Sequence, residues 1–510
     1  MPTKFPAHGE QQLDTKIFRK YKGVVNNSAR NALPDEAWFY LENIQPIGDA
    51  NLQTIPDKST ALVDYSAHTP YWSNYVNVNG VDYLITFGVD GTVQAYNIVA
   101  QTTAQIGTGL SGSGSRLDQW KNTELLIIDS SGYYNWPGAG LIALIAGAGV
   151  PSSGTDIAVA FGRVWILQGR LLTFSGPNDF SAASFAVANG AGSIALVDPK
   201  LRGLITRIIF QNGYLYLIAA SGINVISDVY VPTGAAPPTP LFTNLNIQAI
   251  IGSDQPGSVY AFNQSLVFAN RYGAWNLNGT NAQKISTDID GTWKYIDFSQ
   301  SISGGQVTVN NILCQAFLIK RLNDPTFGSN TVIAMYHDEK WWFANYGAVT
   351  FAMSALVNNT PALFGFIGGK LFQLMSITAI TNPATLLKTP LWGMEDDLAD
   401  KQIIRAGFEV VITSNAGTFT MSVDGVNNSA AAVNLNSGGG VAWINNANNT
   451  VQWQNNSLAI VIWQSNAYIL FNGSSPAMYS KYVGATIAAS AAAYQFSSVF
   501  LDYKLRARWQ

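Results

Sequence analysis

Short apolar strands joined in pairs by tight turns recur along this sequence. The segment Ser265–Gly279, SLVFANRYGAWNLNG, places two apolar runs on either side of a turn at Asn270–Gly273. Six further segments of this kind begin at Tyr83, Leu125, Arg163, Tyr214, Val332 and Leu363. Each turn contains Gly or Asp, which hairpin turns favour because these residues tolerate a positive φ. A single hairpin is marginally stable in water, so each unit must bury its apolar face against a neighbour.

The spacing of these hairpins predicts a β-propeller. They begin about 30 to 65 residues apart, which is close to the roughly 40 to 50 residues of known propeller blades. We therefore expect an all-β protein with a β-propeller of six or seven blades. A set of stacked β-sandwiches is the alternative, because sandwiches are also built from repeated hairpins.

The chain changes character after residue 380, where strands lengthen and turns become clusters of Asn and Gly. We expect an N-terminal arm and docking strand over residues 1–60, the propeller over 61–380 and an additional β-sandwich-like domain over 381–510. The segment DDLADKQIIRAG around Ala399 is the best candidate for a short helix.

Two well-patterned strands have no hairpin partner beside them in the sequence. The first is AWFYLEN at 37–43, and the second is SVFLDYKLRARWQ at the C-terminus. The second alternates apolar residues at odd positions from 499 to 509 with charged residues at even positions from 502 to 508, which predicts a half-exposed strand with a basic face. Because folds usually cover a long unpaired edge, we expect at least one of the two to pair with a strand distant in sequence.

Composition limits the kinds of partner that the protein can bind. Charged residues make up 12% of the chain, about half the usual share of roughly 25%. Uncharged polar groups or other subunits must therefore cover much of the surface. The net charge of -3 argues against binding nucleic acid by counterion release, which needs clustered Lys and Arg.

The same sequence gives little sign of disulfides, export or membrane insertion. The lone cysteine, Cys314, excludes an intramolecular disulfide framework. The N-terminus MPTKFPAHGEQQ has no apolar core of the kind that a secretory signal needs. The longest apolar run, GLIALIAGAGV at 140–150, is too short to span a bilayer and predicts a buried strand or loop.

Histidines and carboxylates are the main candidates for chemistry. His8, His68 and His337 show no metal-ligand spacing. His337 begins the turn HDE, which is either an acid–base cluster at a propeller loop or a solvated turn. The carboxylates of MEDDLADK are either a glycosidase-like acid group or a charged linker between domains. They are Glu395, Asp396, Asp397 and Asp400.

Two further motifs come close to known binding patterns. STDIDGTW, at Ser286–Trp293, approaches the Asp-box of sialidases, but Asp290 stands where the motif requires Gly. The same residues lack the later ligand of a calcium loop, so we interpret the segment as a turn. DTKIFRKYKG interleaves Lys16, Arg19, Lys20 and Lys22 with aromatic residues, which fits either an arm for an anionic partner or a solvated N-terminal arm. We therefore assign no catalytic, cofactor-binding or metal-binding residue and predict that the protein is not an enzyme.

Several segments resemble the tail nozzle, or packaged-DNA stabilisation, proteins of short-tailed bacteriophages. These segments are ALPDEAWFYLENIQP with the LQTIPD that follows it, LLTFSGPNDF at Leu171–Phe180 and YGAWNLNGTNAQKISTDID at Tyr272–Asp290. In that family they are blade strands of a propeller. The resemblance consists of short motifs spread over roughly residues 20 to 380. The C-terminal domain offers little that matches.

The resemblance implies a structural component of the virion. It would form a homohexameric ring below the portal and adaptor proteins, next to tail fibres or spikes, with DNA passing transiently along its axis and no membrane insertion. A receptor-binding protein or a glycan-acting propeller of a phage tail is the alternative. A glycan enzyme would need two carboxylates about 5 to 9.5 Å apart. A receptor-binding protein would expose aromatic side chains such as Trp341 and Trp342 at its blade tips.

Overall fold

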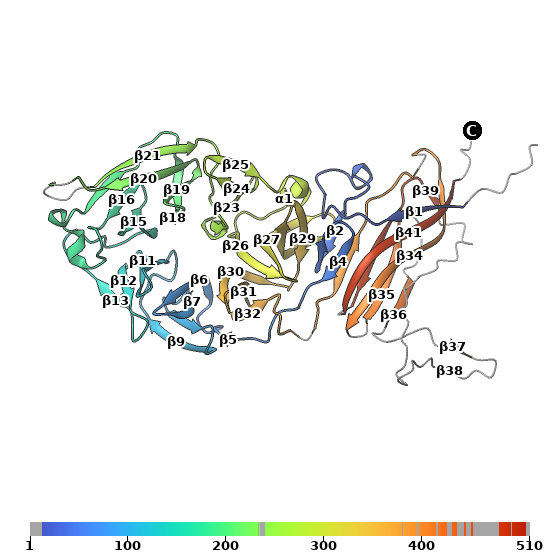
Figure 1. Ribbon diagram of the computed structural model, residues 1–510, viewed down its shortest axis with the longest axis horizontal. Helices are drawn as coiled ribbons and strands as arrows, with labels where there is room; N and C mark the ends of the chain where they lie inside the picture. Colours follow the sequence, from blue (N-terminus) through green and yellow to red (C-terminus); the bar gives the residue numbers. More distant parts are fainter. Residues whose placement is uncertain are drawn as a thin grey trace, which may run out of the picture.

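A computed structural model of the chain describes residues 13–232, 234, 240–379, 381–394, 397–414, 417–425, 431–435, 443–444, 450–451, 479–490 and 492–505. Within these ranges almost all regular structure is β-strand, and the single α-helix is the one-turn α1, Asp290–Trp293. The molecule is elongated, with a propeller at one end and two packed sheets at the other (Figure 1). The all-β fold class, a propeller with an additional sandwich-like unit, is confirmed.

The propeller has seven blades, and each is built on four antiparallel strands. Blade 1 contains β6 (Pro70–Val78), β7 (Val81–Gly88), β8 (Val93–Asn97) and β9 (Thr102–Gly107). Blade 2 contains β10 (Arg116–Trp120), β11 (Glu124–Asp129), β12 (Gly132–Trp136) and β13 (Ala143–Ile145). Blade 3 contains β14 (Asp156–Ala160), β15 (Arg163–Gln168), β16 (Leu171–Phe174) and β17 (Gly192–Ala195). Blade 4 contains β18 (Arg202–Gln211), β19 (Tyr214–Ser221), β20 (Ile223–Tyr230) and β21 (Leu241–Gln248).

The remaining three blades complete the circle. Blade 5 contains β22 (Tyr260–Phe262), β23 (Ser265–Asn270), β24 (Gly273–Asn278) and β25 (Asn281–Lys284). Blade 6 contains β26 (Ser303–Val309), β27 (Ile312–Asp324), β28 (Gly328–His337) and β29 (Lys340–Ala344). Blade 7 contains β30 (Val349–Val357), β31 (Thr360–Ile367), β32 (Lys370–Leu374) and β5 (Val63–Asp64). First strands of neighbouring blades contact one another, so these strands surround the centre.

All seven hairpins expected from the sequence are present. Six join the second and third strands of a blade, and the hairpin that begins at Val332 joins the third and fourth strands of blade 6. The turns of these hairpins include residues with positive φ, such as Gly91, Gly169 and the pair Gly368–Gly369. Asn and Gly adopt this backbone at low cost, which explains why the turn residues marked the hairpins.

A short strand from the N-terminal side closes the propeller. In blade 7, β5 pairs antiparallel with β32, with Val63 opposite Leu371. The N–H of Leu62 also donates to the carbonyl of Leu371 at 2.8 Å. The last blade therefore takes its outer strand from the beginning of the chain, which ties the two ends of the propeller together.

The second lobe combines strands from both ends of the chain in two sheets. One sheet contains β1 (Asp14–Phe18), β3 (Ile44–Ile47), β4 (Asn51–Thr54), β34 (Lys401–Ser414), β39 (Tyr479–Ser480) and β41 (Ala493–Leu505). The other contains β2 (Tyr40–Glu42), β33 (Thr385–Lys388), β35 (Gly417–Asp424), β36 (Ala431–Leu435) and β40 (Gly484–Ala489). A separate pair is formed by β37 (Trp443–Ile444) and β38 (Thr450–Val451). The segment expected as an N-terminal arm thus supplies strands to this lobe.

One continuous sheet joins the two lobes. β2 pairs parallel with β29 of blade 6 on one side and antiparallel with β33 on the other, so thirteen strands lie in one sheet. β41 pairs with β1, β4 and β34, which Figure 1 shows side by side. Both strands that lacked a local hairpin partner pair with segments distant in sequence, as expected.

Three expectations about local structure were wrong. The helix candidate around Ala399 becomes a turn followed by β34, because its apolar residues are needed in the sheet. The apolar run at 140–150 is not buried: it forms the outer strand β13, with Leu141 and Leu144 exposed. In β41 the even-numbered face is not simply basic and solvated, because Asp502 is buried and accepts a hydrogen bond from Thr15 at 2.6 Å. Residues 506–510 lie outside the described part.

Candidate functional site

Three sequence motifs meet at a pocket between the N-terminal segment, blade 5 and blade 6. We call it the junction pocket, and its volume is about 390 Å³. It is lined by Lys22, Asp49, Gln283, Lys284, Ile285, Thr287, Asp288, Tyr336, Asp338, Glu339 and Lys340. Lys22 comes from DTKIFRKYKG, Asp288 from STDIDGTW, and Asp338 with Glu339 from the HDE turn. The fold therefore brings together charged residues that lie more than three hundred positions apart.

The turn between β28 and β29 has an unusual residue pair for its backbone. Asp338 and Glu339 have φ values of 46° and 60°. The turn Asn310–Asn311 of the same blade, with φ values of 47° and 63°, uses the residue type that this conformation favours. A Glu with positive φ is uncommon and costs energy. Glu339 therefore occupies this turn against the backbone preference.

Opposite charges are balanced across the junction pocket. The ammonium of Lys340 lies 3.0 Å from Asp49, and the ammonium of Lys284 lies 2.8 Å from Asp290. Burial raises the pKa of Asp288, the nearby charge of Lys22 opposes the shift, and the carboxylate of Glu339 adds to it. A pocket of this kind can bind a polar or zwitterionic surface of a partner through charge pairs.

The histidine of the HDE turn does not contribute to this pocket. His337 Nδ1 lies 2.9 Å from the carbonyl oxygen of Leu313 on the neighbouring strand, so its ring is held by its own sheet. The described residues include no group of three or more His, Cys, Asp or Glu side chains arranged to hold a metal ion. The arrangement therefore offers carboxylates and ammonium groups without a neighbouring imidazole base.

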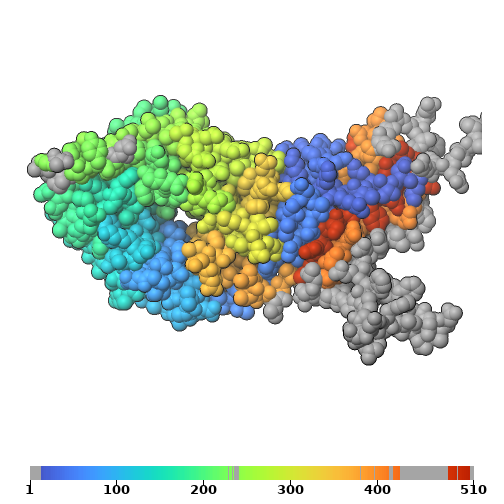
Figure 2. Space-filling model, in the orientation of Figure 1, coloured from blue at the N-terminus to red at the C-terminus, as the bar shows by residue number. Residues whose placement is uncertain are grey.

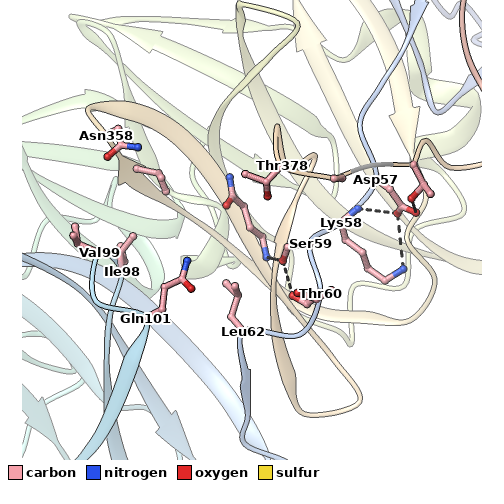
Figure 3. A pocket seen from close by; sticks show the side chains of 14 residues that line it. Asp57, Lys58, Ser59, Thr60, Leu62, Ile98, Val99, Gln101, Asn358 and Thr378 are labelled. Carbon is pink, nitrogen blue, oxygen red and sulfur yellow. Dashed lines mark hydrogen bonds and ion pairs between the residues drawn. The ribbon is translucent and has the colours of Figure 1, made fainter. Parts of the chain in front are cut away.

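A larger hollow lies where blade 7 closes against blade 1, and we call it the closure pocket (Figure 3). Its volume is about 640 Å³. It is lined by Asp57, Lys58, Ser59, Thr60, Leu62, Ile98, Val99, Gln101, Val357, Asn358, Gln373, Thr378, Ala379 and Thr381. Hydroxyl and amide groups form much of this wall, and Leu62, Ile98 and Val99 supply an apolar part.

The closure pocket is shaped by the strand that closes the propeller. The N–H of Ser59 donates to the carbonyl of Gln373 at 2.8 Å, and the N–H of Gln373 donates to Ser59 Oγ at 3.0 Å. Lys58 Nζ lies 3.9 Å from Asp57 Oδ1, a loose ion pair at the rim. No sequence motif indicated this pocket, because its walls come from loops whose proximity only the closed propeller creates.

The other candidate residues lie apart from both pockets. His68 pairs with Asp90 at 2.8 Å, and this contact lowers the pKa of Asp90 to about 2. Asp397 and Asp400 are exposed at the turn before β34, as expected for a charged linker. His8, Glu395 and Asp396 lie outside the described residues. Cys314 is buried and unpaired, and burial raises the pKa of its thiol to about 12.

The aromatic and basic residues singled out in the sequence motifs are part of the core or of the sheets. Trp341 and Trp342 are each 1% exposed, so they form no sugar-binding platform at a blade tip. Trp293 of STDIDGTW is buried, and its indole N–H donates to the carbonyl of Asn270 at 2.9 Å. The basic N-terminal segment is not a free arm, because Lys16 belongs to β1 and pairs with Asp35.

The comparisons with known proteins do not assign a function to this chain, so function is inferred from its fold and its sites. Neither a protein-family model nor a curated protein matches this sequence. A chain in the crystal structure of BBS1N in complex with ARL6DN, soaked with mercury, is similar over 64% of this chain and 98% of that chain. The TM-score is 0.39 and the sequence identity is 10%, so the similarity adds nothing to the functional assignment. In the described part of the chain, no helix has the length and apolar character needed to cross a membrane.

Proposed function

We propose that this protein is a structural subunit of the tail nozzle of a short-tailed bacteriophage. Six copies form a ring that closes the channel of portal and adaptor, retains the packaged DNA and conducts it at ejection. The observation that carries the proposal is the propeller, whose blades contain two of the segments with the family resemblance, LLTFSGPNDF and YGAWNLNGTNAQKISTDID. The segment ALPDEAWFYLENIQP lies outside the blades, although the resemblance implies a blade strand. It forms the connection between the lobes: Trp38, Tyr40 and Leu41 are fully buried, and β2 lies between β29 and β33.

The shape of the molecule supports a role as a ring subunit. A ring is closed by contacts between two different faces of each subunit. The propeller and the sandwich-like lobe provide such faces on one body, because they share a sheet. Apolar side chains are also exposed on outer strands of the propeller, including Leu144 on β13 and Tyr230 and Leu245 at the edge of blade 4. Exposed apolar side chains of this kind suit contacts between subunits.

The charge of the chain suits a channel through which DNA slides. Each contact between a basic side chain and a phosphate adds affinity and slows passage. The net charge of -3, from 28 basic and 31 acidic residues, keeps such contacts few. Retention would then depend on closing the channel sterically and not on binding the DNA.

The first test is the mass of the assembly. Size-exclusion chromatography with light scattering should show a complex with portal and adaptor that is heavier than the portal–adaptor complex alone by six times the 55.0 kDa of one chain. The same measurement without these proteins is the control. A chain that stays monomeric in the presence of both proteins contradicts the proposal.

The second test uses phage particles that lack this protein. They should package DNA and then lose it, and electron microscopy of complete particles should show sixfold density below the adaptor. Particles that keep their genome and infect normally contradict the nozzle role. Density for a trimeric spike at the tail periphery supports the receptor-binding alternative instead.

A third test addresses the glycan-acting alternative. We expect no turnover of glycan, ester or peptide substrates, since the three histidines are scattered along the sequence and the sequence shows no matched pair of acids. His337→Ala and Asp338→Ala are the matched variants. Turnover that disappears in either variant contradicts a purely structural role.

A further inference from the structure

A small cavity lies at the centre of the propeller, away from both pockets described above. Its volume is about 70 Å³, and its walls come from β6, β18, β26, β30 and the turn Pro256–Ser258 that precedes blade 5. Because the first strands of the blades surround the centre, this cavity belongs to the central channel. Figure 2 shows this face of the molecule hollowed where the blades meet. A single water needs roughly 10–15 Å³ by such a measure, so the cavity has room for a small polyatomic ion.

Arg207 gives the cavity a hydrogen-bond donor without an acceptor. Arg207 lines the cavity, and its side chain is 13% exposed. Its Nη1 donates to Asp156 Oδ1 at 2.8 Å. Its Nε is enclosed by protein atoms, whereas its Nη2 is not enclosed in this way and has no hydrogen-bond partner among the described residues. An acceptor in the cavity would pair with this donor, and hydrogen bonds to charged groups are the stronger ones.

The charges around the cavity favour an anion. Arg207 is the only charged residue among the described residues that line the cavity. A second guanidinium, that of Arg116, lies 4.9 Å from the ring centroid of Trp72, which forms part of the wall. Two positive groups therefore lie at or beside a cavity whose own walls carry no carboxylate.

The two nearby acidic residues, Asp118 and Asp156, accept hydrogen bonds from neighbouring blades. Asp118 accepts the N–H of Val159 at 2.6 Å, and Asp156 accepts the N–H of Ile208 at 2.6 Å. Each bond connects one blade to the next, because the donor lies on the first strand of the following blade. Burial raises the pKa of Asp118 to about 6 and also raises that of Asp156. Both carboxylates are held by these hydrogen bonds and do not line the cavity.

Two further polar side chains complete the donor set. Asn74 lines the cavity, and its Oδ1 accepts the N–H of Tyr75 at 3.0 Å, which leaves its amide NH₂ as a donor. Ser354 lines the cavity from β30. We propose that this channel cavity binds a compact oxyanion, such as inorganic phosphate, through Arg207 Nη2, the amide of Asn74 and the hydroxyl of Ser354. A planar guanidinium is the preferred partner of phosphate and carboxylate oxygens. This site is independent of the nozzle role.

Thermal unfolding of the full chain in increasing phosphate tests the site. A ligand that binds only the folded state raises the melting temperature in a saturable way. Three other salts are compared at matched ionic strength. Sulfate tests for any tetrahedral oxyanion, acetate tests for a carboxylate, and chloride measures the general effect of salt. Arg207→Lys keeps the charge beside Asp156 and removes the Nη2 donor, and Asn74→Ala removes the amide donor. Each should weaken phosphate binding about tenfold or more, since hydrogen bonds to charged groups contribute that much.

Arg19→Lys is the matched control, because Arg19 is exposed and directly follows β1 in the second lobe, away from the residues that line the cavity. It should bind phosphate like the natural chain. No saturable effect of phosphate, or the same effect in all variants, overturns the proposal. If Arg207→Lys fails to fold, Asn74→Ala decides the question. Crystals grown in phosphate should show the ion next to Arg207 Nη2, and density for water alone at that position overturns the proposal.

Discussion

At the scale of single residues, buried arginines hold the propeller to the second lobe. Arg321 is fully buried, donates to Asn330 at 2.7 Å and to the hydroxyl of Tyr40 at 3.0 Å, and lies over the rings of Tyr40, Phe327 and Phe343. Tyr40 belongs to β2, the strand that connects the lobes. The Arg321 side chain of blade 6 therefore holds β2, the strand that joins the two lobes in one sheet.

We expect Arg321→Ala to lower the free energy of unfolding by about 3 kcal/mol or more, because it removes desolvated cation–π contacts and two hydrogen bonds. Urea unfolding followed by tryptophan fluorescence measures the loss. The exposed Arg271 offers the control: Arg271→Ala should change the stability by no more than about 0.5 kcal/mol. An equal effect of both substitutions would show that Arg321 has no special role.

Asp118 should make stability depend on pH. Burial raises its pKa from 3.8 to about 6 in the folded protein. The folded state therefore binds more protons between these values, so this contribution to stability is present below about pH 4 and is lost as the pH rises through 6. Asp118→Asn should gain stability relative to the natural chain over that range. Unfolding free energies at several pH values measure the difference.

Asp198 provides a control of opposite sign. The backbone N–H of Lys200 and the amide of Asn224 lower its pKa, so its contribution is present above the unfolded pKa and is lost on acidification. Asp198→Asn should therefore lose stability relative to the natural chain as the pH rises. The assignment for Asp118 is wrong if the two variants change in the same direction.

At the scale of elements, the sequence predicts those features that depend on residues close together in the chain. All seven hairpins were recognisable, because their turns use Asn, Gly and Asp and their strands are apolar. The closing strand β5 has only two residues and leaves no periodic pattern. β2 lies within the well-patterned segment AWFYLEN, but that pattern does not identify its partner strands. Their places depend on partners some 300 positions away, which no local pattern specifies.

For the candidate sites, too, some residues were recognised from the sequence and others are brought together only by the fold. The HDE turn was singled out from its residues, but Lys22 and Asp288 reach it only through the fold. Trp341 and Trp342 could not be assigned to surface or core from their side chains alone, and the structure buries both. The closure pocket and the channel cavity have no sequence signal, because their walls come from several blades.

The C-terminal strand should be essential for a folded second lobe. Val499, Leu501 and Tyr503 of β41 are buried, and the strand pairs with β1, β4 and β34. Deleting residues 499–510 leaves β1 without its partner strand and opens the edge of β34, a liability for aggregation. We expect low solubility and loss of assembly, measured by size-exclusion chromatography. Lys504→Ala, which changes one side chain of the same strand, is the control and should stay soluble. A truncated chain that folds and assembles normally contradicts this expectation.

At the scale of the whole molecule, the two lobes form one folding unit. A single apolar core contains Phe18 and Trp38 from the N-terminal segment, Trp341 from blade 6 and Phe496 from β41. The ring of Trp38 lies 4.9 Å from that of Phe18 and 5.9 Å from that of Phe496. A subunit of this kind transmits force between its ends without a hinge, which suits a ring that must resist packaged DNA.

A fragment of residues 61–380 should therefore fail to behave as an independent propeller, even though it keeps all seven blades and the closing strand β5. Removing β2 exposes the outer edge of β29, and with it apolar surface around Trp341 and Phe343, which are 1% and 0% exposed in the full chain. Each large side chain that loses its burial costs about 1.5–3 kcal/mol. We expect the fragment to aggregate, and the full chain to unfold in one transition by both tryptophan fluorescence and far-ultraviolet circular dichroism. Adding residues 13–60 and 381–510 back as separate chains should restore solubility if the loss of pairing is the cause. A soluble fragment with the melting temperature of the full chain would mean that the propeller is stable without the second lobe, and that the shared sheet serves assembly alone.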